Sequence, residues 1–569
     1  MNRRNQNLES PKLGRRTLLK GAASLAGGAL LPSAVVAESK TAVNGCSTIV
    51  YAGAGKAVVE TTAGKVSGYV RNGIFTFKGM PYAAPVGGAA RFMPPAKPKP
   101  WAGARSSMQY CQVCPQVART GWANDEEAWL FSWDDGIPGE DCLRANVWTP
   151  GINDNKKRPV MVWLHGGGFQ AGSGQELPSY DGENLSRRGD VVVISVNHRL
   201  GVLGYLNLAE VGGAKYAGAA NAGGLDLVAA LEWVRDNIAN FGGDPGNVTI
   251  FGQSGGGGKV SALMAMPAAK GLFHKAIVQS GSGLRMALAE NTARLAAATL
   301  AELNLDGNQL DQLHKLPVQS LIAAGQAAAR KLAPAGGGLR VFQPRADRIG
   351  WAPTVDGKIL PQHPFDPVGP AISADVPLLV GTTLNEFTSG INNPNVDALT
   401  EGDLAERVKA MYGERGGQII AAFRKANPKA KPFDILSFIS TVPTRHNAVT
   451  QAGLKAAQGA APAYLYLFTW QTPALDGRPR AFHCSELAFC FDNIDRCVNM
   501  TGGGADARAL ASKVSEAWIA FARKGDPNHP GLPKWPAFTG DKGATMIFDN
   551  KCEVKNDPDG PERRTVTMA

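Results

Sequence analysis

The sequence predicts an α/β protein built on a doubly wound, mostly parallel β-sheet with helical cap insertions. Short apolar runs rich in Val, Ile and Leu recur along the chain without alternating polar residues, as expected for strands buried on both faces. Helical patterns separate these runs, and such strand–helix alternation is typical of a parallel sheet covered on both sides. We therefore expect one large sheet between two layers of helices.

The series of predicted buried, parallel strands begins near residue 158. The apolar runs lie at 158–165, 190–196, 247–251, 274–279, 376–380 and 463–470. Upstream, residues 57–80 alternate in short runs and are predicted to form antiparallel strands. Residues 225–240 and 506–524 have apolar residues at helical spacing. The Ala- and Leu-rich segment 288–330 is predicted to be helical and to cap the sheet without joining it.

The first 37 residues have the composition of an export signal. A basic start precedes an apolar, Ala-rich stretch from Gly21 to Val36, and small residues favour cleavage after Ala37. Arg15–Arg16 resembles a twin-arginine signal, with an ordinary Sec signal as the alternative. A membrane anchor is disfavoured because the apolar run is short and Gly-rich. We predict a periplasmic or secreted protein with a single domain over residues 38–569.

Composition excludes several other classes of protein. The chain of 569 residues has 59 Lys+Arg and 48 Asp+Glu, and a formal net charge of +11. No dense basic run interleaved with aromatic residues follows residue 37, which argues against nucleic-acid binding. No later stretch of about 18 apolar residues occurs, so no membrane span is expected after signal removal. The 8 cysteines are an even number, which favours disulfides in an exported chain.

The segment Gly252-Gln253-Ser254-Gly255-Gly256 matches the pattern G-x-S-x-G. In so Gly-rich a chain the string alone is weak, but it directly follows the run 247–251 and precedes a helical stretch near 259–266. A sharp turn from strand to helix strains the serine backbone and lifts its Oγ clear of the sheet. The alternative is a Gly-rich turn with a surface serine, which the flanking elements disfavour. Ser254 is therefore the predicted nucleophile.

A second glycine cluster, His165–Phe169, also ends a predicted buried strand. Three successive glycines free the backbone to turn its N–H groups inward and let a substrate approach closely. We assign the N–H groups of Gly167, Gly168 and Gly255 to an oxyanion hole, where losing one donor typically costs roughly 10²–10³ in rate. A flexible loop is the alternative, and it does not explain this cluster's place after a strand.

A serine hydroxyl needs a nearby base. In hydrolases whose serine lies in such a turn from strand to helix, the base follows the acid in the chain and lies on a loop after a late strand. His483 follows the run 463–470 and a turn-rich loop, whereas His446 precedes that run and His529 lies in a Pro/Gly loop after the last long helix. His483 is therefore the predicted base.

The acid should follow a strand between Ser254 and His483. Glu386 comes just after the run 376–380, at the sheet edge where open α/β folds bind ligands. Its role would be to accept the Nδ1–H of His483 and stabilise the imidazolium. Asp356 and Asp366 compete for this role, but their surroundings are more typical of turn residues.

With these motifs in place, the chain resembles the type-B carboxylesterase family, which includes the cholinesterases and the bacterial p-nitrobenzyl esterases. The resemblance covers nearly the whole mature chain. It rests on the segments 77–83, 140–148, 165–169, 197–204, 240–245, 252–256, 279–281, 385–386, 483–486 and 521–528. It implies the α/β-hydrolase fold and the triad Ser254, Glu386 and His483. It also implies the oxyanion hole already assigned and a disulfide between Cys114 and Cys142.

Four features depart from the family pattern. Gln253 stands where many members have Glu, Gly255 replaces the usual Ala, and His198 replaces a usual Tyr. Three cysteines also surround the base, namely Cys484, Cys490 and Cys497, and Cys490 and Cys497 could form a local bridge. The pairing of the remaining cysteines is open.

The predicted activity is hydrolysis of a small-molecule carboxylic ester through an acyl-enzyme, which needs no metal or organic cofactor. A related acyl hydrolase acting on a carbamate, amide, thioester or lactone is the alternative. A non-catalytic binding protein of cholinesterase type is disfavoured, because all three triad residues are present. The preferred acyl and alcohol groups and the oligomeric state do not follow from the sequence. Activity should rise as His483 deprotonates near its ordinary pKa of about 6.5.

Overall fold

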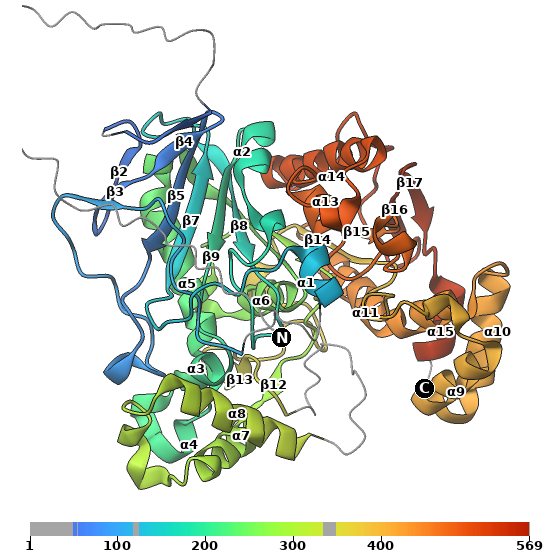
Figure 1. The fold of residues 1–569 in the computed structure, drawn as a ribbon, viewed down its shortest axis with the longest axis horizontal. Helices are drawn as coiled ribbons and strands as arrows, with labels where there is room; N and C mark the ends of the chain where they lie inside the picture. Colours follow the sequence, from blue (N-terminus) through green and yellow to red (C-terminus); the bar gives the residue numbers. More distant parts are fainter. Residues whose placement is uncertain (1–48, 54, 118–124, 334–348, 568–569) are drawn as a thin grey trace, which may run out of the picture. The chain divides into compact units, whose positions relative to one another are not determined.

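The computed structural model describes residues 49–53, 55–117, 125–333 and 349–567 (Figure 1). The compact unit to which they belong spans Ile49–Ala569. The predicted export signal, residues 1–37, lies outside the described residues. Among the described helices, none combines the length and the apolar character needed to cross a membrane.

A 12-stranded sheet forms the centre of the fold. From β9 to β16 in spatial order all neighbours pair in parallel, and the strands at both ends pair antiparallel. The mostly parallel sheet is therefore as predicted. In spatial order the strands are β1 (Val50–Tyr51), β4 (Tyr69–Arg71), β5 (Ile74–Pro81), β7 (Arg144–Thr149), β9 (Val192–Val196), β8 (Arg158–Leu164), β10 (Gly243–Gln253), β11 (Lys275–Gln279), β14 (Leu378–Thr383), β15 (Ala463–Phe468), β16 (Ala544–Phe548) and β17 (Glu553–Asn556).

Two small sheets lie outside the central one. The first contains β2 (Val58–Thr61), β3 (Gly64–Ser67) and β6 (Ala104–Ser106), and the second contains β12 (Ala287–Leu288) and β13 (Thr354–Val355). The helices of the described residues are α1 (Asp125–Phe131), α2 (Glu183–Gly189), α3 (Gly201–Tyr205), α4 (Ala209–Gly212), α5 (Ala222–Asn237), α6 (Gly255–Ala265), α7 (Ala289–Glu302), α8 (Val318–Leu332), α9 (Glu401–Tyr412), α10 (Gly416–Ala426), α11 (Pro432–Ala457), α12 (Leu487–Cys490), α13 (Val498–Thr501), α14 (Ala505–Lys524) and α15 (Gly560–Thr567).

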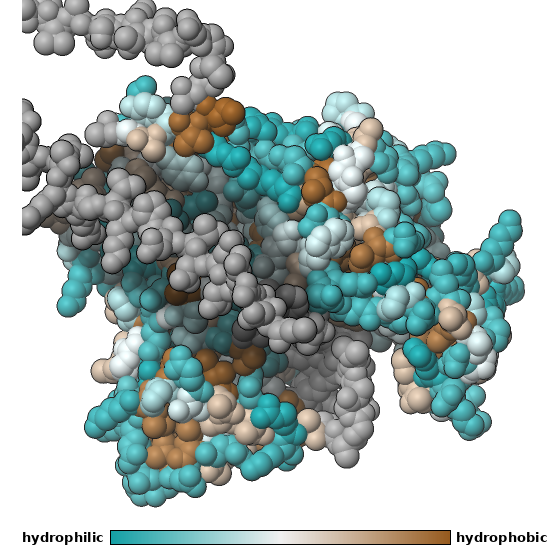
Figure 2. Space-filling view, in the orientation of Figure 1, coloured by the Kyte–Doolittle hydropathy of each residue, from teal (hydrophilic) through white to brown (hydrophobic). Residues whose placement is uncertain are grey.

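Side chains of one strand enter two different cores, as a sheet covered on both faces requires. In β8, Val160, Val162 and Leu164 belong to a core that also contains residues of α5 and α6. Met161 and Trp163, which point to the other face, belong to a core with residues of α12 and α14. The outer surface is mostly hydrophilic on the face drawn in Figure 2, where apolar residues form small separate patches.

The helical segments differ from the predicted ranges in two places. The segment 288–330 forms two helices, α7 and α8, that pack against each other (Figure 1). Between them Asp306 caps a short 3-10 helix, Gly307–Gln312, so the sequence interrupts the helical run. The helix after Ser254 begins at Gly255, earlier than the predicted 259. Glycine is a poor helix former, and close packing against neighbouring backbone overrides that preference here.

The order of the central strands creates a switch point between β8 and β10. From β8 the chain proceeds to β9 on one side, and it then crosses through α5 to β10 on the other side. Leu164, the last residue of β8, is in register with Gly252 near the end of β10. The loops that follow these two strands therefore meet at the carboxyl edge of the sheet, where open α/β folds bind ligands.

Candidate active site

Ser254 occupies a strained turn between β10 and α6. Its φ of 57° and ψ of −124° lie in a region that side-chain-bearing residues rarely adopt. Its N–H donates to the carbonyl of Gln279 at the end of β11, at 2.8 Å. A Cβ on Gly256 would lie 2.0 Å from the carbonyl oxygen of Leu164. The need for glycine two residues after Ser254 thus has a direct steric cause.

The glycine loop after β8 lies against the first turn of α6. Gly167 and Gly168 have φ of 86° and 60°, and the carbonyl of Gly167 accepts the N–H of Ala171 at 3.1 Å. A Cβ placed on Gly255 would lie 2.5 Å from the Gly168 nitrogen. Within the described part of the chain, no hydrogen bond uses the N–H groups of Gly167, Gly168 or Gly255. The three predicted donors are therefore close together and available.

Glu386 and His483 are brought together by two neighbouring parallel strands, β14 and β15. Beyond the strand ends, Asn385 forms an isolated bridge with Phe482, and the N–H of His483 donates to the Glu386 carbonyl at 3.0 Å. This backbone contact aligns the two side chains, whose Nδ1 and Oε2 atoms are 2.5 Å apart. The other oxygen of Glu386 accepts the N–H of Thr383 at 3.0 Å. Glu386 is thus fully buried and satisfied at both oxygens.

Opposing effects set the protonation of His483. Burial lowers the pKa of the imidazole, while the adjacent Cys484 sulfur and the Glu386 carboxylate both raise it, and together they place the pKa well above its ordinary value. The ring of Phe387 packs against the imidazole at a centroid distance of 4.3 Å. The predicted onset of activity near the ordinary pKa therefore shifts to higher pH.

Gln253 connects His483 to the turn that carries Ser254. Its side-chain nitrogen lies 3.0 Å from Nε2 of His483 and 3.3 Å from Nδ1. Since Gln253 directly precedes Ser254, the imidazole lies beside the turn that carries Ser254. No hydrogen bond joins Ser254 Oγ to His483 in this structure. Catalytic hydrogen bonds in unliganded enzymes often form only when substrate binds.

The competing acids have the structural roles expected of turn residues. Asp356 accepts the N–H groups of Lys358, Ile359 and Leu360 through one oxygen, which fixes a turn. Asp366 pairs with Arg285 at 3.1 Å, and both side chains are exposed.

Two buried ionisable side chains near the Ser254 turn were assigned no role in the sequence analysis. Glu486 accepts a hydrogen bond from Gln279 at 3.3 Å, and burial together with the charge of Glu386 raises its pKa to about 7. Lys259 lies on α6 and is 1% exposed. Neither position has a sequence pattern that indicates burial, because one is a lysine after a glycine run and the other a glutamate that directly precedes the short helix α12.

The cysteines of the described residues are free thiols. The predicted bridge between Cys114 and Cys142 is therefore not formed in this structure. The two side chains are nevertheless in contact, since a hydrogen bond with Cys114 is the first cause of the raised pKa of Cys142, followed by burial. Cys490 and Cys497 are likewise free and buried.

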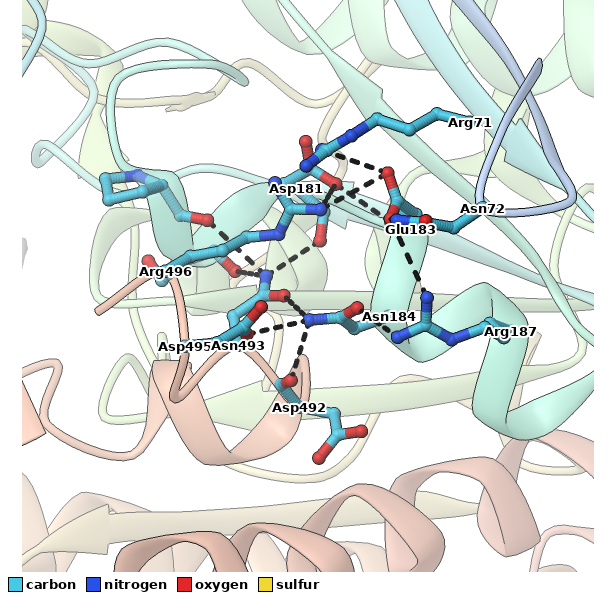
Figure 3. Close-up of polar contacts among 12 residues, drawn as sticks. Arg71, Asn72, Asp181, Glu183, Asn184, Arg187, Asp492, Asn493, Asp495 and Arg496 are labelled. Carbon is cyan, nitrogen blue, oxygen red and sulfur yellow. Dashed lines mark hydrogen bonds and ion pairs between the residues drawn. The ribbon is translucent and has the colours of Figure 1, made fainter. Parts of the chain in front are cut away.

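An ion-pair network anchors the chain beyond His483 (Figure 3). Arg496 contacts Asp181 and Glu183 at 3.5 and 3.3 Å, and Glu183 also pairs with Arg71 at 3.1 Å. The buried Asn493 side chain donates to the carbonyl of Asp181 at 2.8 Å. These contacts join the segment after α12 to α2 and to the end of β4, so the loop that carries His483 is held at its far end.

Comparison with known proteins agrees with this geometry. The sequence matches the carboxylesterase family over residues 55–564. The para-nitrobenzyl esterase of Bacillus subtilis (strain 168) is 35% identical over 517 residues, which are 90% of this chain and 98% of that enzyme.

Two solved structures have the same fold. An esterase from Clostridium hathewayi that can hydrolyze aliphatic aromatic polyesters aligns with a TM-score of 0.75 and 37% identity, over 90% of this chain and 98% of that one. A carboxylesterase of Geobacillus stearothermophilus aligns with a TM-score of 0.74 and 34% identity, over 90% and 100% of the two chains. The predicted α/β-hydrolase fold is confirmed. The chain belongs to the carboxylesterase family and is a serine-type carboxylic ester hydrolase.

Proposed function

We propose that Ser254 is the nucleophile, His483 the general base and acid, and Glu386 the carboxylate that orients His483. The observation that carries this assignment is the buried Glu386 carboxylate, whose Oε2 lies 2.5 Å from Nδ1 of the partly exposed His483, beside a serine in a strained turn at the start of a helix. Because Nδ1 faces Glu386, its proton stays there, and Nε2 keeps the lone pair that takes the proton of Ser254 in place of the Gln253 N–H that lies 3.0 Å from it.

In the first half of the reaction, Ser254 Oγ forms a bond to the ester carbonyl carbon while Nε2 of His483 takes the hydroxyl proton. The carbonyl π electrons move to oxygen and create an oxyanion. When that oxygen re-forms its double bond, the bond to the alcohol oxygen breaks and the alcohol leaves with the proton from Nε2. The product is an acyl group on Ser254.

In the second half, His483 takes a proton from water as the water oxygen bonds to the acyl carbon. Collapse of this second tetrahedral intermediate releases the carboxylic acid and returns the proton to Ser254. The N–H groups of Gly167, Gly168 and Gly255 donate to the oxyanion in both intermediates. The first N–H of α6 is among these donors, and a helix N-terminus favours negative charge.

The test uses a fluorophosphonate probe together with hydrolysis of p-nitrophenyl butyrate. Wild type should be labelled and active, while Ser254→Ala should be unlabelled and lose at least about 10⁴ in kcat. Ser261→Ala is the matched control, since Ser261 is a buried serine on the same helix whose Oγ hydrogen-bonds the Gly257 carbonyl at 3.0 Å. It should retain label and activity. A folded wild type without label, or a labelled Ser254→Ala, contradicts the assignment.

We also propose that residues 1–37 direct export, with cleavage after Ala37, and that Cys114 and Cys142 join outside the cytoplasm. The basic start and apolar stretch support the first point, and the contact between the two buried thiols supports the second. Intact-mass analysis of the exported protein tests both. The chain should begin at Glu38 and gain two hydrogens on reduction. A mass that retains residues 1–37, or that reduction leaves unchanged, contradicts the respective point.

A further inference from the structure

Lys259 lies behind the glycine loop that follows β8. It is the fifth residue of α6, the helix that begins directly after Ser254, and it is 1% exposed. Its ammonium donates to the carbonyls of His165 at 2.8 Å and Gly166 at 3.3 Å. A buried lysine is costly unless its charge is compensated, so these contacts call for an explanation that the triad does not supply.

The Gly166 carbonyl receives a second donor from its own loop. Nδ1 of His165 lies 3.0 Å from the same oxygen. Because the carbonyl lies between two donors, and one of them is charged, the Gly166–Gly167 peptide is strongly polarised. Chains of hydrogen bonds polarise one another in a low-dielectric interior, and charge-assisted bonds are about twice as strong as neutral ones.

The other end of that peptide is the N–H of Gly167. In a planar trans peptide the C=O and N–H bonds point in opposite directions. An ammonium that holds the Gly166 oxygen therefore lies behind the peptide whose N–H faces away from it. The N–H of Gly167 is one of the three donors assigned above to the oxyanion.

We propose that Lys259 is a positioning residue of the oxyanion hole, where its ammonium holds the Gly166 carbonyl and so orients and polarises the N–H of Gly167. This inference rests on the proposed function, because it gives Lys259 a role only if an oxyanion forms next to Ser254. It also links the nucleophile to the hole, because α6 begins directly after Ser254 and carries Lys259.

Four ionisable side chains face the Lys259 ammonium, and none of the four carries a positive charge at pH 7. They come from the segments after β8 and β9 and from the segment before β7: His165, Glu176, His198 and Cys114. Burial and then the charge of Lys259 hold the pKa of both imidazoles well below the ordinary value, so they are neutral at pH 7. Their rings stack at 4.9 Å. Arg199 lies nearby, but its guanidinium forms an ion pair with the Asp226 carboxylate at 2.6 Å.

The ammonium itself should lose its proton within the working pH range. Burial lowers the pKa of Lys259 to about 7, although Glu176 and Cys114 oppose that effect. The charged form is therefore present at lower pH and is lost as pH rises through about 7. Since His483 must be neutral to act as base, loss of the Lys259 charge should reduce the rise in kcat/KM that His483 deprotonation produces.

The experiment compares Lys259→Met with Lys455→Met. Lys455 is a matched control, because it is also a buried lysine whose ammonium donates to two backbone carbonyls, those of Ser373 and Ala374, at 3.0 and 2.6 Å. Those residues precede β14, whereas Glu386 follows it, so Lys455 lies at the opposite edge of the sheet. The readouts are kcat, KM and the Ki of a trifluoromethyl ketone, which forms an anionic adduct with a nucleophilic serine.

Lys259→Met should lower kcat by about tenfold, a fraction of the loss expected for a missing donor, with KM unchanged within about twofold. The Ki of the trifluoromethyl ketone should rise by the same factor as kcat/KM falls. Lys455→Met should leave kcat and Ki unchanged, even where it lowers the melting temperature. Full kcat and unchanged Ki in a folded Lys259→Met would overturn the proposal.

Lys259→Arg provides a second variant if Lys259→Met does not fold, because a guanidinium keeps its positive charge across the working pH range. The ratio of wild-type kcat/KM to that of Lys259→Arg should fall by up to about tenfold between pH 7 and roughly pH 9, since the His483 limb is common to both enzymes. A ratio that stays constant over that range overturns the proposal. Failure of the proposed function looks different, because wild type would then show neither fluorophosphonate labelling nor esterase activity.

Discussion

On one side of Ser254 the site depends on ionisable side chains, and on the other side it depends on backbone N–H groups. The base side consists of Glu386 and His483, aligned by a backbone hydrogen bond between the same two residues. The oxyanion side consists of Gly167, Gly168 and Gly255, whose positions are set by close backbone packing. Both sides end at the same turn, but different physical effects control them.

The difference teaches where each side is vulnerable. On the base side, a change of charge alters which proton is present, so its consequences should appear in the pH profile. On the oxyanion side, geometry decides, because an N–H group that moves by 1 Å can cost about 10² in rate. Lys259 is the exception on that side, since it brings a titratable charge to an otherwise uncharged donor set.

The largest expected effect comes from removing the charge on the base side. Glu386→Gln should lower kcat by about 10⁴, because the imidazole loses the partner that fixes its tautomer. The carboxylate raises the pKa of His483, so its loss should lower that pKa and move the acid limb of kcat/KM to lower pH. The measurement is a pH profile of kcat/KM with p-nitrophenyl butyrate from pH 5 to 9.

Asp356→Asn is the control for that profile, since Asp356 was the competing acid. It holds a turn through three N–H groups, so its replacement should reduce stability and leave the acid limb in place. If Asp356→Asn shifts the limb and Glu386→Gln does not, the acid has been assigned to the wrong residue.

The positions of the main site residues could be predicted because each follows a strand with a clear sequence pattern. Ser254, Glu386 and the glycine loop come directly after the apolar runs that became β10, β14 and β8. Parallel pairing then brings such strand ends to one edge without further information. His483 required the chain order of the fold as well, because a turn-rich loop separates it from β15.

Lys259 and the contacts of Gln253 could not be predicted in the same way. A lysine after four glycines has no apolar periodicity that would indicate burial, and lysine is rarely buried. Its burial arises because the glycine loop of β8 covers it, which is a contact between segments about 90 residues apart. The strand β7 was also missed, although all six of its residues are buried, since polar residues such as Arg144 and Asn146 interrupt its apolar pattern.

The smallest expected effect tests geometry alone on the oxyanion side. A Cβ at position 255 would lie 2.5 Å from the Gly168 nitrogen and 2.9 Å from its Cα, so Gly255→Ala should push the glycine loop away from α6. We expect kcat to fall by about tenfold, as one donor is displaced by a fraction of an ångström. Because no ionisable group changes, the acid limb of the kcat/KM profile should stay where it is in wild type.

Gly540→Ala is the control for introducing a methyl group, since nothing lies within 4 Å of a Cβ at that exposed turn. An unchanged kcat in Gly255→Ala would mean that the loop yields without losing its donors. A shifted acid limb would mean instead that the two sides of Ser254 are coupled.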